Sequence, residues 1–477
     1  MSQQPHVIYI LSDEHFGGAM SHMGDDNVQT PHMDQMAAEG ISFGRAYSNC
    51  PICVPARGTI FSGRHAHAGP VQYFFDVYKA SAPSIATVMR EAGYHTAYFG
   101  KWHCGVVQNQ EPPEVRENRD DYTLWPHRTP EFHRAGFQDW YGFEINNAPF
   151  DGFYYHEHEA NPRKMDKYQT DFLTDLAIDY LKNYDGNQPL FLVLSVEPPH
   201  FPLEAPQAFK DRFDPASLDV PPTFADTPEM RDMLATYYAM VENLDMNLGR
   251  LRETINQTSG FQDNTFSVYF SDHGDYMGTK GAINRKENAH EQSVRVPAIF
   301  HWPGHIPAQG LDHSHLFGLV DMFATTLGLV GIDIPTHNQG LDFSPLLQGK
   351  AFTGPDAVLL EMSGNPRWNL DFLDWRGVVT NKWKYAFYET GHEWLYDLEN
   401  DPHEQTNLIE TQPEIRAEMR QTLLQLMADT REPYFDVLMQ HGVAPEGPAL
   451  DVGVQSGTGA VSPHWADLIK SHPDVEC

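Results

Sequence analysis

The sequence predicts an α/β protein with a large, mostly parallel mixed sheet flanked by helices, followed by a small α+β domain with an antiparallel sheet. Short apolar runs alternate with helical patterns over residues 1–364, an order typical of parallel sheets. Beyond residue 364, short strand-like runs dominate and one helical pattern follows. A chain of 477 residues is long enough for one large domain with a smaller one appended.

The predicted elements follow in chain order. Val7 to Leu11 is the first buried strand. A helical pattern through Met89 ends at Gly93 and leads into a strand from Thr96 to Phe99. Further strands are predicted at Pro189–Val196, Thr265–Phe270 and VPAIFHW, and a long helix after Thr227-Pro228.

Three further segments complete the predicted organisation. Residues 108–167 are rich in His and aromatic residues with little periodicity, which predicts an insertion that shapes a substrate site. Residues 365–431 form the small α+β domain, with strands in WRGVVTN, KWKYAFYE and HEWLYDLE and a helix from Pro413 to Ala428. Residues 432–477 are expected to be a tail, which in a homo-oligomer would wrap a partner subunit.

Composition excludes several classes of function. The formal charge of −33 disfavours nucleic acid and anionic membranes as partners. No run approaches the roughly 20 apolar residues that cross a bilayer, and the N-terminal run is too short for a signal peptide. The expected location is cytoplasmic, or periplasmic if a leader has been removed. Four cysteines do not make a disulfide scaffold.

Polar residues follow four of the predicted strands. They are Asp13 and Glu14, then Lys101 and His103, then His200, and finally Asp272 and His273, with Lys286 further along. Because ligands of open α/β sheets bind beyond the carboxyl ends of the strands, these residues are predicted to form one site. Taken singly, the acid pair also fits a helix cap, Asp272-His273 a turn, and His200 a packed loop residue.

The types of side chain indicate the ligands of this site. Carboxylate oxygens favour Ca²⁺, Mg²⁺ or Mn²⁺ over zinc. Lysine and histidine donors beside such a cation suit a tetrahedral oxyanion, phosphate or sulfate.

The stretch Asn49 to Arg64, NCPICVPARGTIFSGR, contains two overlapping patterns. C-P-I-C is typical of a redox dithiol or half of a zinc site. However, a zinc site needs a second pair of ligands, and Cys104 and Cys477 do not supply one. Cys50 and Cys104 are most simply small buried residues. The second pattern, C-V-P-A-R, begins at Cys53.

CVPARGTIFSGR resembles the signature of type I sulfatases, members of the alkaline phosphatase superfamily, in which C-x-P-x-R is followed by [TS]-G-[RK]. Further stretches look like sulfatase landmarks in the usual order: GYHTAYFGKWHCG, EPPHFP, SDHGDYMG, HEQSVRVPAIF and WLYDLENDPHEQTNL. Together they span most of the first 410 residues. The resemblance implies an alkaline-phosphatase-like fold and hydrolysis of a sulfate ester.

In that family a formylglycine-generating enzyme oxidises the cysteine to formylglycine (3-oxoalanine), whose aldehyde hydrates to a diol. The resemblance implies the same for Cys53. One hydroxyl of the diol attacks sulfur and displaces the alcohol, and the other then loses its proton and expels sulfate.

The resemblance also implies a role for each matching residue. The metal ligands are Asp13, Glu14, Asp272, His273 and the modified Cys53, with Glu14 standing where relatives often carry Asp, Gln or Asn. Arg57 holds the diol and the carboxylates, Lys101 bridges diol and sulfate, and His103 takes the proton of the second hydroxyl. His200 and Lys286 contact sulfate, although NRKENAHEQS around Lys286 departs from the common pattern.

The expected substrate is a sulfated mono- or oligosaccharide, because Trp125, Tyr155, His156 and His158 offer ring faces and hydrogen-bonding groups. Ordinary loop packing is the alternative for these four. A phosphonate monoesterase or phosphodiesterase of the same superfamily is the nearest rival function. A catalytically silent metal- or carbohydrate-binding protein with an unmodified Cys53 is the rival from another class.

Overall fold

The computed structural model describes residues 4–74, 76–105, 128–281, 286–363 and 374–431, and within them the large sheet has ten strands. Its central strand β1 (His6–Asp13) lies between parallel neighbours β8 (Leu190–Pro199) and β9 (Thr265–Ser271), and β8 is followed by parallel β4 (His95–Lys101). The outer strands are β5 (Asp139–Phe143), β6 (Phe153–His156) and β7 (Arg163–Lys164) on one side, and β11 (Ala298–His301), β2 (Ile41–Phe43) and β12 (Gly310–Asp312) on the other.

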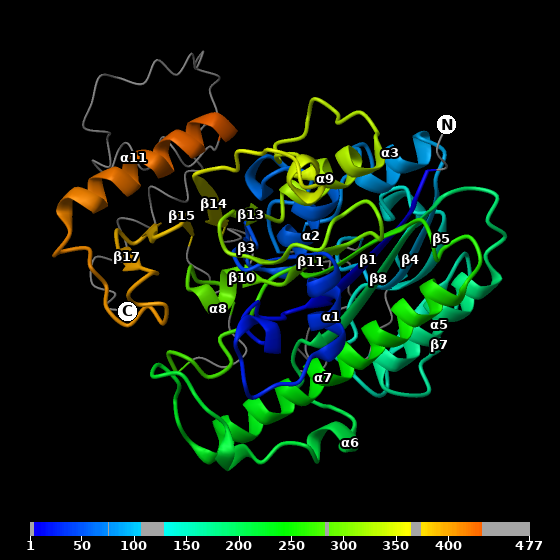
Figure 1. The fold of residues 1–477 in the computed structure, drawn as a ribbon, viewed down its shortest axis with the longest axis horizontal. Helices are drawn as coiled ribbons and strands as arrows, with labels where there is room; N and C mark the ends of the chain where they lie inside the picture. The colour runs from blue at the N-terminus through cyan, green and yellow to red at the C-terminus, as the bar shows by residue number, and fades with distance from the viewer. Residues whose placement is uncertain (1–3, 75, 106–127, 282–285, 364–373, 432–477) are drawn as a thin grey trace, which may run out of the picture.

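Helices cover both faces of this sheet (Figure 1). One face carries α1 (Pro31–Glu39), α5 (Gln169–Asn183) and the long α7 (Pro228–Gln257), and the other carries α2 (Cys53–Ser62), α3 (Ile85–Glu91) and α9 (Asp321–Val330). Alternate residues of β1 enter different cores: Val7, Tyr9 and Leu11 pack in one, Ile8 and Ile10 in the other. β1 is buried along its whole length, which explains its unbroken apolar sequence.

Shorter elements complete the large domain. They are the three-stranded sheet of β10 (Arg295–Val296), β3 (Ala46–Tyr47) and β13 (Phe317–Gly318), and the short helices α6 (Gln207–Lys210), α8 (Glu291–Val294) and α10 (Ser344–Leu347). The predicted long helix is α7, and the side chain of Thr227 caps it by accepting a hydrogen bond from the amide of Met230 at 3.3 Å.

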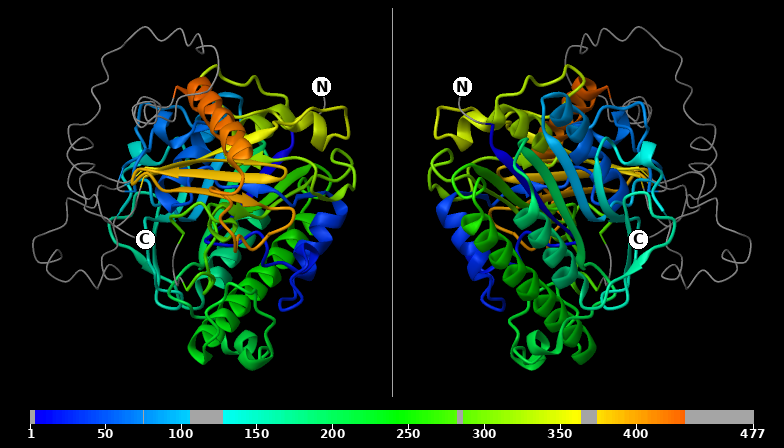
Figure 2. Two further views of the ribbon diagram at one scale, coloured as in Figure 1. Left: turned by 90° about the vertical axis from the view of Figure 1, so that its left-hand side faces the viewer. Right: turned by 90° about the vertical axis from the view of Figure 1, so that its right-hand side faces the viewer.

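The predicted small α+β domain is an antiparallel sheet of β14 (Ala357–Met362), β15 (Trp375–Thr380), β16 (Trp383–Tyr388) and β17 (Glu393–Asp397), with α11 (Pro413–Thr430) packed on one face (Figure 2). Its first strand begins at Ala357, before the boundary expected at residue 364. Because β14 is a buried apolar run, AVLLEM, its sequence does not differ from that of a strand in the large sheet.

Part of the segment 108–167, predicted to be an insertion with little periodicity, is a strand of the large sheet. Residues 108–127 lie outside the described residues, whereas 139–143 form β5, a parallel strand of the large sheet beside β4. The tail 432–477 also lies outside them. Among the described residues, the structure contains no helix long and apolar enough to cross a membrane.

Candidate active site

Four parallel strands place polar side chains at one edge of the large sheet. β1 ends at Asp13 and β4 at Lys101, while β8 and β9 each end just before a site residue. The residues at or just after these ends are Asp13, Glu14, Lys101, His103, His200, Asp272 and His273. The structure thus brings together the residues that the sequence groups into one site.

Cys53 enters this cluster as the first residue of α2, after an extended Ile52. Its side chain is buried, with Sγ 3.1 Å from His273 Nε2 and 3.6 Å from Asp13 Oδ1. The amino end of a helix stabilises negative charge, because its first amides have no partners within the helix. Cys53 therefore occupies the place where an anionic oxygen would be stabilised.

Arg57, one turn further along α2, is completely buried and ties three strand ends together. Its Nε donates to Asp272 Oδ2 at 3.0 Å, and its Nη2 donates to Asp13 Oδ2 at 3.3 Å. Its Nη1 donates to the carbonyl of Lys101 at 2.7 Å and to Ser195 Oγ at 2.9 Å. A guanidinium suits this position because its planar donors can meet several acceptors at once.

Four donor atoms here could hold a cation. They come from Asp13, Cys53, Asp272 and His273, are all buried, and lie within 4.8 Å of one another. The Nδ1 of His273 donates to the carbonyl of Gly274 at 3.0 Å, which leaves its Nε2 lone pair facing the cluster. Oxygen and imidazole donors of this kind fit a divalent cation.

Glu14 lies beside the four donors, together with His200 and Lys286. Lys286 Nζ is 3.0 Å from Glu14 Oε1, and His200 Nε2 is 3.3 Å from Oε2, but neither buried oxygen has a well-formed hydrogen bond among the described residues. Burial raises the pKa of Glu14 well above its ordinary value, despite the opposing charge of Lys286. A bound cation would offset this cost, so these residues fit a metal.

Lys101 and His103 face the same space from β4. Lys101 Nζ is 2.6 Å from Asp13 Oδ2 and 3.9 Å from Glu197 Oε1. Burial by itself raises the pKa of Asp13, but Lys101, His200 and Arg57 hold it well below its ordinary value. Both ring nitrogens of His103 are buried with no hydrogen-bond partner among the described residues. Burial, then Lys101 and Arg57, lower the pKa of the His103 ring.

Two of these residues adopt backbone conformations that are uncommon outside glycine. Glu14 has φ 70° and His103 φ 58°, both in the left-handed region. Strain of this kind costs on the order of 1–3 kcal/mol per residue and concentrates at functional sites.

Comparison with known proteins identifies the family. The family model "Sulfatase" matches residues 5–332, and the model "N-sulphoglucosamine sulphohydrolase, C-terminal" matches residues 281–430. An "Ulvan-active sulfatase" of Formosa agariphila is 30% identical over 394 residues, covering 80% of this chain and 73% of that protein. The chain belongs to the sulfatase family.

Two further relatives agree with this assignment. The N-acetylgalactosamine-6-sulfatase of Homo sapiens is 27% identical, over 74% of this chain and 68% of that one. The crystal structure of the putative sulfatase yidJ from Bacteroides fragilis has a TM-score of 0.81 and 25% identity, and the match covers 91% of this chain and 97% of that one. The protein is therefore a type I sulfatase of the alkaline phosphatase superfamily, a sulfuric ester hydrolase, and the predicted fold class is confirmed.

The residues predicted to bind substrate in this sulfatase lie away from the strand ends. His156 stacks on Tyr141 with ring centroids 4.6 Å apart, and His158 is largely exposed with Nδ1 3.8 Å from Glu131 Oε2. Tyr155 is buried on β6, and Trp125 lies outside the described residues. β6 is antiparallel to β5, so it runs away from the catalytic edge. A substrate role for these residues stays a prediction.

Two residues of β8 serve the sulfatase site but were not singled out from the sequence. Ser195 accepts a hydrogen bond from Arg57, as described above. Glu197 is buried and accepts from the amides of Asn146 and Asn147 at 2.8 and 3.1 Å and from Gln169 Nε2 at 2.7 Å. Glu197 follows the apolar run FLVLSV, so the rule that groups strand-end residues includes it with His200, but no role for it follows from the sequence.

Proposed function

We propose that this sulfatase hydrolyses the sulfate ester of a mono- or oligosaccharide, using formylglycine at position 53 and a bound Ca²⁺. The observation that carries the proposal is the position of Cys53. Cys53 is the buried first residue of α2, and its Sγ lies among the donor atoms of Asp13, Asp272 and His273. The cationic side chains of Lys101 and Lys286 are part of the same site. A formylglycine-generating enzyme would have to modify this residue before it is buried by folding.

Formylglycine and the cation would each supply a chemistry that the thiol lacks. A hydrated aldehyde at position 53 supplies an oxygen nucleophile, and a divalent cation neutralises charge on the oxygens of a sulfate ester. Asp13, Glu14 and Asp272 would hold the cation with His273. This mainly oxygen donor set favours Ca²⁺, with Mn²⁺ or Mg²⁺ as alternatives.

The remaining residues of the site bind the sulfate and move protons. Lys101 and Lys286 each lie within ion-pair distance of a carboxylate of the site, and each would donate a hydrogen bond to a sulfate oxygen. His200 donates Nδ1–H to the carbonyl of Phe201 at 2.5 Å, so its Nε2 faces Lys286 Nζ, 2.9 Å away. Lys286 and His200 would then together hold a proton for the departing alcohol oxygen.

His103 would hold the proton that the nucleophilic group gives up. Neither of its ring nitrogens is committed to another group of the described chain, and its low pKa keeps the ring neutral and able to accept a proton. Arg57 would orient Asp13 and Asp272 and would contact neither the metal nor the sulfur atom of the sulfate ester.

A saccharide as the alcohol part of the substrate is supported by relatives. The C-terminal family model is named for N-sulphoglucosamine, and the human relative for N-acetylgalactosamine-6-sulfate, both sulfated sugars. The formal charge of −33 disfavours a long, densely sulfated polymer as substrate.

The test has two parts. Peptide mass spectrometry of the protein from its native host should find an aldehyde at position 53, and a thiol there would overturn the catalytic proposal. The modified protein should then release sulfate from members of a panel of defined sulfated saccharides, and should hydrolyse an aryl sulfate faster than the matching aryl phosphonate. A faster phosphonate reaction would show that the protein is primarily a phosphonate monoesterase.

A further inference from the structure

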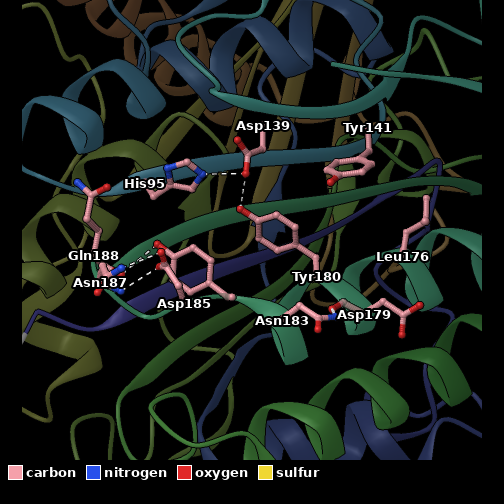
Figure 3. A pocket seen from close by; sticks show the side chains of 11 residues that line it. His95, Asp139, Tyr141, Leu176, Asp179, Tyr180, Asn183, Asp185, Asn187 and Gln188 are labelled. Carbon is pink, nitrogen blue, oxygen red and sulfur yellow. Dashed lines mark hydrogen bonds and ion pairs between the residues drawn. The ribbon is translucent and has the colours of Figure 1, made fainter. Parts of the chain in front are cut away.

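A hollow of about 680 Å³ is lined by residues of β4, β5 and α5 (Figure 3). It lies where β4 and β5 begin, at the opposite edge of the large sheet from the catalytic cluster. His95 and Asp139, the first residues of β4 and β5, form one wall, and Tyr180 and Tyr184 at the end of α5 form another. Because β4 runs from His95 to Lys101 at about 3.3 Å per residue, the hollow lies about 20 Å from the catalytic edge.

The tyrosines of this hollow are held in place by hydrogen bonds and ring contacts. Tyr180 donates to Asp139 Oδ2 at 2.6 Å, and His95 Nε2 lies 2.8 Å from the same oxygen (Figure 3). The rings of Tyr180 and Tyr184 lie 5.9 Å apart and 31° from parallel. Half-buried rings fixed in this way present flat apolar faces at little entropic cost, as a pocket for a sugar ring requires.

The charges around the hollow select against anions. Its lining includes the carboxylates of Asp139, Asp179 and Asp185, and neither a lysine nor an arginine is among the described lining residues. The exposed amides of Asn183 and Asn187 add groups that accept and donate hydrogen bonds. The lining can therefore bind hydroxyl groups but would repel a sulfate.

We infer that this hollow binds an uncharged stretch of polysaccharide, separately from the reaction at the catalytic edge. A volume of about 680 Å³ is within the usual range of small-ligand sites, roughly 300–1,000 Å³. Since the hollow and the catalytic edge are about 20 Å apart, a short saccharide in one does not reach the other. A long chain with unsulfated stretches would occupy both and stay attached between reactions.

The test measures binding directly, so its outcome is independent of catalysis and of the state of Cys53. The probes are dextran and chemically desulfated carrageenan, each compared with its sulfated form by affinity electrophoresis and calorimetry. The variants are Tyr180→Ala and the double variant Asp179→Ala/Asn183→Ala, whose two positions are exposed on α5. The matched control is Glu414→Ala/Glu418→Ala, two exposed positions on α11.

We expect at least one neutral polysaccharide to bind the wild type and the control equally, and to bind both hollow variants at least about tenfold more weakly. Hydrolysis of p-nitrophenyl sulfate should stay within about twofold of wild type in the double variant. The inference is overturned if neither neutral polysaccharide binds, if binding survives in the double variant, or if the sulfated forms bind more tightly through these residues.

Discussion

Arg57→Lys should weaken the binding of Ca²⁺ without removing the positive charge from the site. The guanidinium makes four hydrogen bonds, to Asp13, Asp272, Ser195 and the carbonyl of Lys101. A single ammonium can replace one or two of them. The Lys101 carbonyl keeps the Tyr98 hydroxyl as a donor and Asp13 Oδ2 keeps Lys101 Nζ, so one or both of the remaining acceptors, Asp272 Oδ2 and Ser195 Oγ, lose theirs. At about 1–3 kcal/mol for each unsatisfied group, the expected loss of stability is about 1–6 kcal/mol.

The affinity for the metal should fall because Asp13 and Asp272 lose the group that orients them. Partners that hold a metal ligand in place are worth about 10–100-fold in metal affinity, and Arg57 holds two carboxylates. Competition with a calcium chelator measures the affinity, and urea unfolding measures the stability. Arg134→Lys is the matched control, because this buried arginine donates to the carbonyls of Thr129 and Glu157, away from the cluster.

Arg134→Lys should therefore lower stability and leave the affinity for Ca²⁺ unchanged. The reasoning is refuted if Arg57→Lys binds Ca²⁺ as tightly as wild type, or if both variants lose affinity to the same extent. In the first case the carboxylates would be held by their strands alone, and in the second the effect would be general destabilisation.

Further predictions concern the proton acceptor, the substrate contacts, the contact of Glu361 in the small domain with His67 in the large one, and the metal. His103→Asn should lower kcat on an aryl sulfate about 10²–10⁴-fold, and an unchanged kcat would exclude His103 as the proton acceptor. His156→Ala or His158→Ala should reduce activity on the native sugar more than on an aryl sulfate; equal losses would count against substrate contact. Burial raises the pKa of Glu361, but His67 then lowers it to about 2 from 4.5, a difference worth about 3 kcal/mol. This stabilisation is present above pH 4.5 and is lost as the pH falls towards 2. Glu361→Gln should therefore lower the stability measured by urea unfolding at pH 7, but much less near pH 3. An equal loss of stability at both pH values would contradict this reasoning. Removal of the metal by EDTA should weaken the binding of inorganic sulfate, measured by calorimetry, at least about tenfold, and unchanged binding would argue against a metal at the sulfate site.

The sequence predicted the catalytic cluster better than its surroundings because the two obey different rules. Parallel strands carry their last residues to a common edge, so Asp13, Lys101 and Asp272 could be grouped from their positions after apolar runs. No such rule applies to the hollow. Its walls come from the starts of β4 and β5 and the end of α5, where hydrophobic periodicity gives no signal.

Segments whose sequence fits more than one kind of structure were also predicted less accurately. β5 is only five residues long and includes polar positions, so it did not stand out from its aromatic-rich surroundings. β14 resembles a strand of either sheet, because the pairing partner of an apolar strand depends on the tertiary fold.

Charge balance explains how so acidic a chain can bind a sulfate ester. Asp13, Asp272 and Glu197 each contribute a negative charge. Glu14 and Asp275 face each other, and burial raises the pKa of both carboxyl groups. Against these five carboxyl groups stand the three cations Arg57, Lys101 and Lys286.

The carboxyl groups of the site thus outnumber its three cations, so the site alone does not favour an anion. A divalent cation would add two positive charges beside these carboxyl groups and so favour the single negative charge of a sulfate monoester. A bound metal would then serve binding as well as reaction, and the attraction that it creates would act among buried groups, where charges are only weakly screened. Distant acidic residues on the surface contribute little, since salt screens their charge beyond about 8–10 Å.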